Sequence, residues 1–174
     1  MTEEQRKLCR DLIIYPDGRI PITKEDFLRR FPSALEHGKL ASRLLEDAYR
    51  THNGEDLGCA LIIGFTFGFE REYTKILSDL VEADWHVSHE DVVSALDELH
   101  SRDTVEALFR ATQWIPKSLE YDDSRALAIK AIWALGKIPG TEAEAKLEAL
   151  ARSDNAILRR TAEEQLERRT GSRP

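Results

Sequence analysis

Residues 83–91, ADWHVSHED, combine the side-chain types that bind metals and transfer protons. His86 and His89 stand three positions apart, and Glu90 and Asp91 follow directly. Imidazole and carboxylate groups are common zinc ligands and are also the usual general acids and bases of enzymes. The segment therefore raises two interpretations: a metal or acid–base site, or the polar start of a helix.

The order of these residues favours a helix start. Ser88 followed three positions later by Asp91 is similar to a capping box, in which the first side chain satisfies a free backbone N–H group. Carboxylates in the first helical turn are also stabilised by the helix dipole. A zinc site would need a third ligand, and His86 lies before the expected helix, unlike either histidine of an HExxH motif. We therefore expect no metal and no cofactor, and we expect Trp85 to pack against the core.

The rest of the sequence gives little support for catalysis. It contains no GxSxG motif, no phosphate-binding glycine loop and no CxxC pair. Asp122 and Asp123 are adjacent acids, but neighbouring side chains on a helix point in different directions. Asp123 is instead expected to cap the helix that follows. We interpret the chain as a non-catalytic protein.

The overall composition is that of one folded, acidic domain. The chain has 174 residues, of which 41% are hydrophobic and 33% are charged, and its formal net charge is −7. This length and apolar content suffice for a full core. The acidity disfavours binding to the phosphates of nucleic acids and favours a basic protein as partner.

Nothing in the sequence predicts export or a membrane span. The charged N-terminal segment, MTEEQRKLCRD, lacks the apolar stretch of a signal peptide. The most apolar segment, residues 57–69, is shorter than the roughly 20 residues that cross a bilayer. Cys9 and Cys59 are expected to be free, buried thiols, as in a reducing compartment. We expect a cytoplasmic protein without membrane contact, and the composition leaves its oligomeric state open.

Apolar residues recur at helical spacing along most of the chain. In residues 122–138, for example, Leu127, Ala131 and Leu135 fall on one side of a helix. The same periodicity predicts eight helices from about 36 to 169, arranged as four antiparallel pairs. The predicted helical segments are 38–52, 55–68, 69–83, 88–100, 101–114, 122–138, 141–153 and 154–169.

Two of these helices repeat the same residues in register. Asp123, Leu127, Ala131 and Leu135 each have a counterpart of the same type 31 positions later. A constant offset near 30 residues is typical of repeat proteins, in which helix pairs stack to bury a continuous core. The counterparts are Asp154, Leu158, Ala162 and Leu166.

The repeat resembles the HEAT-repeat family, particularly its short bacterial form. ALGKI at 134–138 is similar to the end of that family's second helix, and DNAILRR at 154–160 is similar to its Asp-x-x-hydrophobic-x-Arg opening. The similarity covers residues 122–169. It departs from the family at Ala128, where an arginine is usual, and in the long connection at 114–123. The resemblance implies an all-α, HEAT-like solenoid of about four helix pairs, spanning residues 36–169.

The ends of the chain differ from the repeats. Residues 12–23, LIIYPDGRIPIT, are β-branched and apolar on both sides of a turn-forming Pro-Asp-Gly, and they predict a short hairpin or extended arm. A short helix over 24–31 follows, capped by Thr23. Residues 1–35 are expected to cap the first repeat, because the ends of a solenoid need a polar cover. The last residues, 170–174, are expected to fray.

Acidic residues are concentrated between Glu82 and Glu106. Eight carboxylates lie in this interval, and Arg102 is its only lysine or arginine. Three further acids follow within residues 120–123. One interpretation is an ordinary solvated helix face, and the other is a surface that binds a basic protein. The sequence leaves both open.

Aromatic side chains beside these acids would provide anchors for such a partner. Trp133 lies off the apolar stripe of its helix; burial against a neighbouring helix is favoured, and exposure as an anchor is the alternative. Trp114 and Tyr121 flank the long connection, and long connections often carry function. The candidate partner-binding residues are Trp85, His86, His89, Glu90, Asp97, Glu98, Trp114, Tyr121, Asp122 and Trp133.

The segments EADWHVSHEDVVSAL and YDDSRALAIKAIWALGKI also resemble small bacterial HEAT-repeat proteins that serve as immunity partners of polymorphic, contact-dependent growth inhibition toxins. This resemblance implies that the protein binds and neutralises a basic toxin, such as a nuclease, through an acidic surface. A HEAT-repeat scaffold or regulatory adaptor using the same surface is the first alternative. A nucleic-acid-modifying enzyme with a HEAT-like body is the second, and it would be expected to carry a basic groove.

Overall fold

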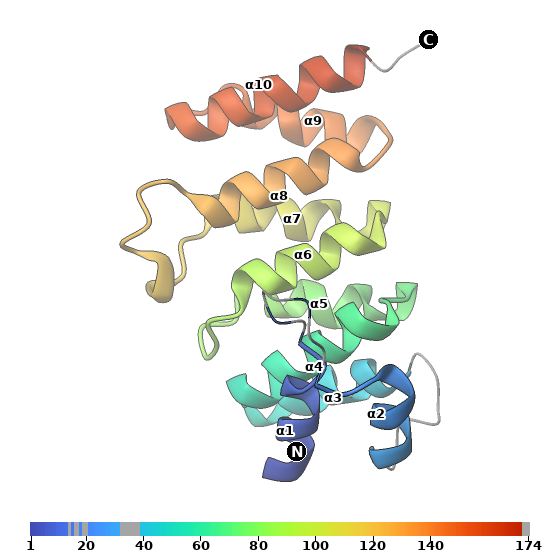
Figure 1. Ribbon diagram of the computed structural model, residues 1–174. Coiled ribbons are helices and arrows are strands. Elements are labelled where there is room, and N and C mark those ends of the chain that lie inside the picture. Colours follow the sequence, from blue (N-terminus) through green and yellow to red (C-terminus); the bar gives the residue numbers. More distant parts are fainter. Residues whose placement is uncertain (14, 16–17, 19–20, 32–38, 172–174) are drawn as a thin grey trace.

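The computed structural model describes residues 1–13, 15, 18, 21–31 and 39–171. Within these ranges every regular element is a helix and no strand is present, which confirms the predicted all-α class (Figure 1). The α-helices are α1 (Glu3–Arg10), α2 (Lys24–Arg30), α3 (Lys39–Thr51), α4 (Gly54–Phe67), α5 (Thr74–Leu80), α6 (His89–Leu99), α7 (Val105–Gln113), α8 (Ala126–Lys137), α9 (Thr141–Leu150) and α10 (Ala156–Gly171).

The eight helices predicted between residues 38 and 169 are all present, as α3 to α10. Short 3-10 turns, η1 (Arg71–Tyr73) and η2 (Arg102–Thr104), precede α5 and α7. The short helix predicted at 24–31 is confirmed as α2. Its predicted cap is also confirmed, since the Thr23 hydroxyl accepts a hydrogen bond from the Asp26 N–H at 3.1 Å.

The N-terminal region contains a helix, α1, which the sequence analysis missed. It begins at a capping box in which the side chains of Thr2 and Gln5 each accept a hydrogen bond from the other residue's backbone N–H. The described residues between α1 and α2 form no strand, and positions 14, 16, 17, 19 and 20 of the predicted hairpin lie outside the described residues.

Helix α1 packs against α4 through a buried charge cluster. Asp56 accepts hydrogen bonds from the Met1 amino group at 2.6 Å and from Arg6 Nε at 2.7 Å. These two partners hold the pKa of Asp56 below its usual value, although burial acts in the opposite direction. Cys9 of α1 and Cys59 of α4 are both free and buried, as predicted.

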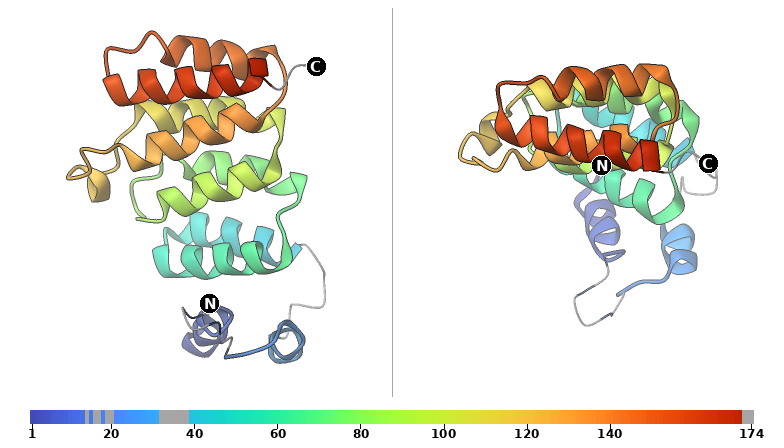
Figure 2. Two further views of the ribbon diagram at one scale, coloured as in Figure 1. Left: turned by 45° about the horizontal axis from the view of Figure 1, so that its top comes forward. Right: turned by 90° about the horizontal axis from the view of Figure 1, so that it is seen from above.

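The remaining helices form two rows. Each helix contacts the next one along the chain in the pairs α3–α4, α5–α6, α7–α8 and α9–α10. The even-numbered helices α4, α6, α8 and α10 lie side by side in one row, and α3, α5, α7 and α9 form the row behind it (Figures 1 and 2). The connections within the pairs therefore lie at one edge of the molecule, and those between pairs lie at the opposite edge.

The repeated residues lie where neighbouring helices meet. Ala131 of α8 and Ala162 of α10 have no exposed surface, and their small side chains let the two helices approach closely. Leu127 and Leu135 are also buried on α8, as predicted, and Leu158 is buried on α10. The predicted stripes therefore contribute to one continuous apolar core.

Helix α10 continues through Gly171, so the helix extends into the tail predicted at 170–174. Residues 172–174 lie outside the described residues. Among the residues that the structure describes, no helix is both long and apolar enough to cross a bilayer.

Two glycines of α4 provide a matched test of this packing. A Cβ atom at Gly64 would lie 2.2 Å from Cε1 of Phe69, whereas a Cβ atom at Gly58 would meet no atom within 4 Å. Gly64→Ala should therefore lower the free energy of unfolding by about 1–3 kcal/mol, because the Phe69 ring must move. Gly58→Ala should raise it by about 0.5–1 kcal/mol, because alanine loses less backbone entropy in a helix.

Urea denaturation of both variants and the parent protein would measure these changes. A gain in stability from Gly64→Ala would contradict the packing of Phe69 over α4.

Candidate functional site

A chain of contacting rings links three of the connections at the edge where the helix pairs turn. His52 stacks on Trp85 at 5.3 Å between ring centroids, His86 stacks on His89 at 4.1 Å, and His89 meets the edge of Trp114 at 4.8 Å. Apart from His89, the first residue of α6, these residues come from the α3–α4, α5–α6 and α7–α8 connections, so the rings fix the three turns relative to one another. We call this set the ring chain; its members are Tyr49, His52, Trp85, His86, His89 and Trp114.

His86 and His89 anchor the connection between α5 and α6. Nε2 of His86 lies 2.9 Å from the Leu80 carbonyl oxygen, and Nε2 of His89 lies 2.9 Å from that of Ala83. A carbonyl oxygen only accepts, so each Nε2 carries a proton and donates it. Nδ1 of His86 accepts a hydrogen bond from the Ser88 N–H at 3.1 Å, which leaves this ring neutral. His86 therefore ties the connection to the last residue of α5, and His89 ties the start of α6 to the connection.

The burial of these rings corrects two predictions. His86 and His89 are 5% and 1% exposed, so they stabilise the turn and do not lie on the surface that a partner would touch. Ser88 precedes α6 as predicted, but its hydroxyl makes no capping hydrogen bond, so the predicted capping box is wrong. Burial, together with the neighbouring His89, lowers the pKa of His86 to about 4. Burial also lowers the pKa of His89.

The acidic interval from Glu82 to Glu106 is largely neutralised in three dimensions. Five of its eight carboxylates form ion pairs with lysines or arginines from outside the interval. Individually such exposed pairs add little stability, typically under about 1 kcal/mol, but they cancel charge. The predicted acidic patch is therefore smaller than the sequence indicated. The pairs are Glu82–Arg110, Glu90–Lys130, Asp97–Lys137, Asp103–Arg71 and Glu106–Lys146.

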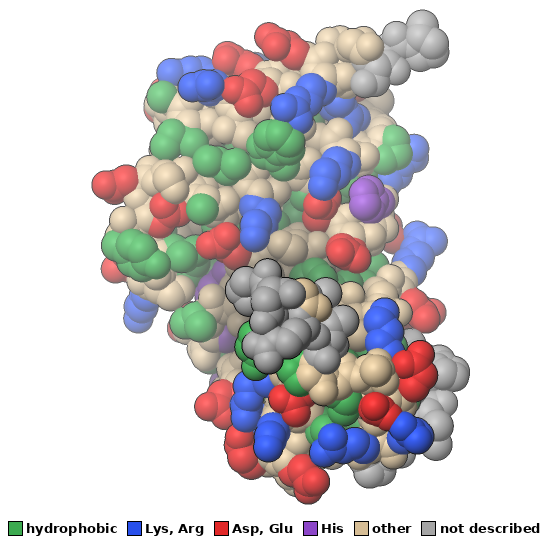
Figure 3. All heavy atoms as spheres, in the orientation of Figure 1, with side chains coloured by type: hydrophobic (Ala, Val, Ile, Leu, Met, Phe, Trp, Pro, Cys, Tyr) green, Lys and Arg blue, Asp and Glu red, His purple; other side chains and the backbone are tan. Residues whose placement is uncertain are grey.

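Exposed apolar side chains gather where two of the connections meet. Val87 is 77% exposed, Ile115 is 44% exposed and Tyr121 is 81% exposed. Val87 belongs to the α5–α6 connection, and the other two belong to the α7–α8 connection, which contacts it through Trp114 and His89. In space-filling view, hydrophobic and acidic side chains lie together over this edge (Figure 3).

Exposed carboxylates lie in and next to the same two connections. Asp84, Asp91, Glu120 and Asp123 are exposed and form no ion pair with any described residue, and Lys117 is the exposed cation of the same connections. We call the combined surface the turn edge; it comprises Asp84, Val87, Asp91, Ile115, Glu120, Tyr121 and Asp123.

The α7–α8 connection is held in place by Asp122. One of its carboxylate oxygens accepts a hydrogen bond from the Ala126 N–H at 2.7 Å, and the other accepts from both the N–H and the hydroxyl of Ser124. These bonds lower the pKa of Asp122, and the bond from Ala126 satisfies the first N–H group of α8. Asp123 was expected to be the N-cap, and this prediction is wrong, because Arg125 occupies the N-cap position in the left-handed conformation and makes no side-chain capping hydrogen bond. Because both carboxylate oxygens of Asp122 already accept hydrogen bonds within the connection, Asp122 stabilises the turn edge and is not one of its binding groups.

The other predicted site residues are not members of the turn edge. Trp85 is half-buried within the ring chain, and Trp114 packs on His89. Glu98 is exposed at the far end of α6. Trp133 is 37% exposed, so the prediction of burial is wrong; the Arg168 guanidinium covers its ring at 4.2 Å.

Val87 and Ile115 were missed by the sequence analysis. Each is a single apolar residue within a connection, where no helical periodicity assigns it a direction. Their positions next to Trp85–His86 and Trp114 are the only indication that the sequence offered.

No three histidine, cysteine, aspartate or glutamate side chains converge in the described ranges as a metal site would require.

Comparison with known proteins gives no relative: no family model, no curated protein and no solved structure matches this chain.

The buried imidazoles predict a dependence of stability on pH. The unfolded chain binds a proton at His86 below pH about 6.5, but the folded protein does so only below about 4. The stabilisation is therefore complete above pH 6.5 and is lost as the pH falls from 6.5 to 4, by about 2–3 kcal/mol. His86→Gln keeps a donor for Leu80 but removes the titration, so its free energy of unfolding should fall less steeply over this interval.

Denaturation curves of the parent protein and the variant at several pH values would separate the contribution of His86 from that of the carboxylates, which are the same in both proteins. Parallel pH profiles would rule out the buried, neutral state of His86.

Proposed function

We propose that this protein is a non-catalytic protein-binding module, a HEAT-like solenoid that recognises a basic protein partner through its turn edge. The observation that carries the proposal is the exposure of Val87, Ile115 and Tyr121 among carboxylates without ion pairs. Monomeric surfaces seldom display large apolar side chains together unless they bind something. The packing of paired helices in two rows supports the solenoid, and the contacts of α1 and α2 with α4 support a cap on its first pair.

The turn edge has the composition of a protein interface. Tyrosine supplies a large contact area and a hydroxyl group while losing little conformational freedom, and such residues dominate the binding energy of many complexes. The surrounding carboxylates would speed the encounter with a cationic partner and would disfavour acidic ones. Because the ring chain and Asp122 fix the connections, the surface would be organised before the partner arrives.

The partner class that fits best is a basic bacterial toxin, with this chain as its immunity protein. A toxin that acts on nucleic acid needs a cationic cleft, and the carboxylates of the turn edge could take the place of phosphates in such a cleft. The resemblance of residues 82–96 and 121–138 to immunity proteins supports the same class.

The proposal predicts that Tyr121→Ala combined with Val87→Asp abolishes neutralisation. The partner would first be captured from the native host with the tagged protein, identified by mass spectrometry and expressed alone to test its toxicity. Loss of two anchors should weaken the complex at least tenfold, as interface anchors usually do, and should release the toxicity in co-expression. Growth and isothermal titration calorimetry would measure the two effects.

Glu163→Lys is the matched control, because Glu163 is exposed on α10, away from the turn edge. This variant should bind and protect like the parent protein. A captured partner that is harmless by itself would support the scaffold alternative, and unchanged binding by the double variant would exclude the turn edge as the interface.

A further inference from the structure

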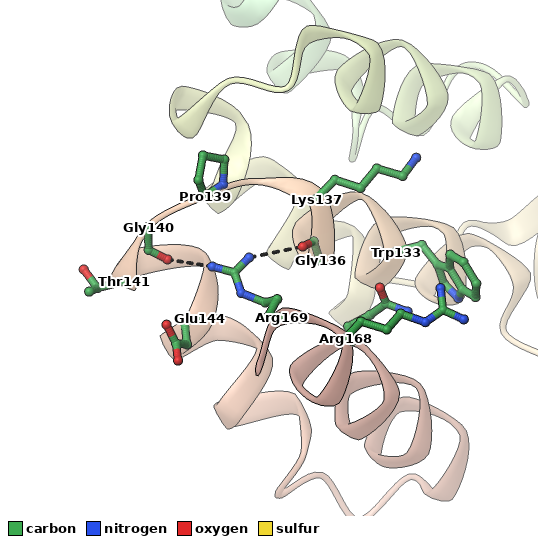
Figure 4. Close-up of a pocket in the computed structure, with 10 residues that line it drawn as sticks. Trp133, Gly136, Lys137, Pro139, Gly140, Thr141, Glu144, Arg168 and Arg169 are labelled. Carbon is green, nitrogen blue, oxygen red and sulfur yellow. Dashed lines mark hydrogen bonds between the residues drawn. The ribbon is translucent and has the colours of Figure 1, made fainter. Parts of the chain in front are cut away.

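A second surface feature lies at the opposite end of α8. Helices α8, α9 and α10 enclose an open groove with a volume of about 610 Å³ (Figure 4). Trp133 and Lys137 of α8 form one side, Arg168 lies on the α10 side, and the α8–α9 connection at Gly140 closes one end. α8 begins at the connection that carries Tyr121 and ends here, so the groove is separate from the turn edge.

The floor of the groove carries a polar group without a partner. Gln165 is 4% exposed, and its Nε2 forms no hydrogen bond with any described residue. Its side chain packs closely on Gly136, where a Cβ atom would lie 2.4 Å from Gln165 Oε1. A buried amide N–H without an acceptor is costly, typically about 1–3 kcal/mol. An acceptor brought by a ligand would remove that cost.

A second set of donors comes from the start of α9. The residue before this ten-residue helix is Gly140, which has φ of 115° and offers no side chain to cap it. The first backbone N–H groups of a helix lack partners within the helix and carry the positive end of its dipole. In this helix they lie at the closed end of the groove, beside Thr141.

Cationic side chains dominate the groove in an otherwise acidic protein. Lys137, Arg168 and Arg169 line it against the single carboxylate of Glu144, although the ammonium group of Lys137 is paired with Asp97 of α6. The guanidinium of Arg102 lies next to it, because a Cβ atom at Gly140 would be 3.3 Å from Arg102 Nε.

Arg169 of α10 holds the α8–α9 connection in place. Its guanidinium donates to the carbonyl oxygens of Ile138 at 2.6 Å and Gly140 at 3.0 Å, as well as to that of Gly136 (Figure 4). It thereby fixes the end of α8 and the path of the connection. No other arginine among the described residues donates to the carbonyl oxygens of Gly136, Ile138 and Gly140.

We propose that this groove binds an acidic peptide segment of a protein partner, with a carboxylate held between Gln165, the start of α9 and Arg168. Amide, backbone N–H and guanidinium groups are the donors that carboxylates prefer. The lining residues Lys137, Thr141 and Arg168 are exposed, so the groove is open along its length and suits an extended chain. Nucleic acid fits less well, because Arg168 already covers the Trp133 ring on which a base would stack.

The test uses a fluorescein-labelled hexaglutamate peptide and the full chain, with hexaglutamine as the uncharged peptide. Fluorescence anisotropy should show saturable binding of hexaglutamate alone. Arg168→Ala and, separately, Gln165→Met should each weaken it about tenfold, since each removes a donor to the carboxylate. Gln165→Met keeps the size of the side chain, and circular dichroism would confirm that both variants are folded.

Arg160→Ala is the matched control, because Arg160 is an exposed arginine of the same helix that pairs with Glu164 outside the groove. It should bind like the parent protein. Equal weakening by Arg160→Ala, or equal binding of hexaglutamine, would overturn the proposal. Tighter binding of inorganic phosphate or of an oligothymidylate of the same charge would also overturn it and would assign the groove to phosphate ligands.

Discussion

The stacking of each helix pair on the next is the constraint on which the rest of this structure depends. A pair of short amphipathic helices cannot bury its apolar face alone, so α8 is stabilised by packing on both α6 and α10. Small residues such as Ala131 and Ala162 make that approach close. Once the helices are stacked, the connections within the pairs must line up along one edge, and side chains distant in sequence become neighbours there.

In the ring chain, polar residues brought together by this alignment have a structural role. His86 and His89 combine the residue types of a catalytic or metal site, yet each donates to a carbonyl oxygen near the end of α5. Their rings also stack on each other and on the neighbouring turns, which fixes the connections that carry Val87 and Tyr121. The two histidines therefore position the surface, and the exposed side chains of Val87 and Tyr121 form it.

The helices could be predicted from the sequence because apolar periodicity reports directly on which face is buried, as at Leu127 and Leu135. Helix α1 was missed because its charged surface hides a short apolar face, Leu8 and Cys9. The charge distribution was harder to predict. Lys130 and Lys137 form ion pairs with carboxylates 40 residues away, so a run of acids in the sequence did not become an acidic face of the same size.

Hydrogen–deuterium exchange of the protein, free and bound to the partner that it captures, tests the central claim most directly. If the turn edge is the interface, binding should slow exchange in residues 84–91 and 114–123 and leave α9 unchanged. Slowed exchange confined to the groove between α8 and α10, with none at the turn edge, would contradict the account.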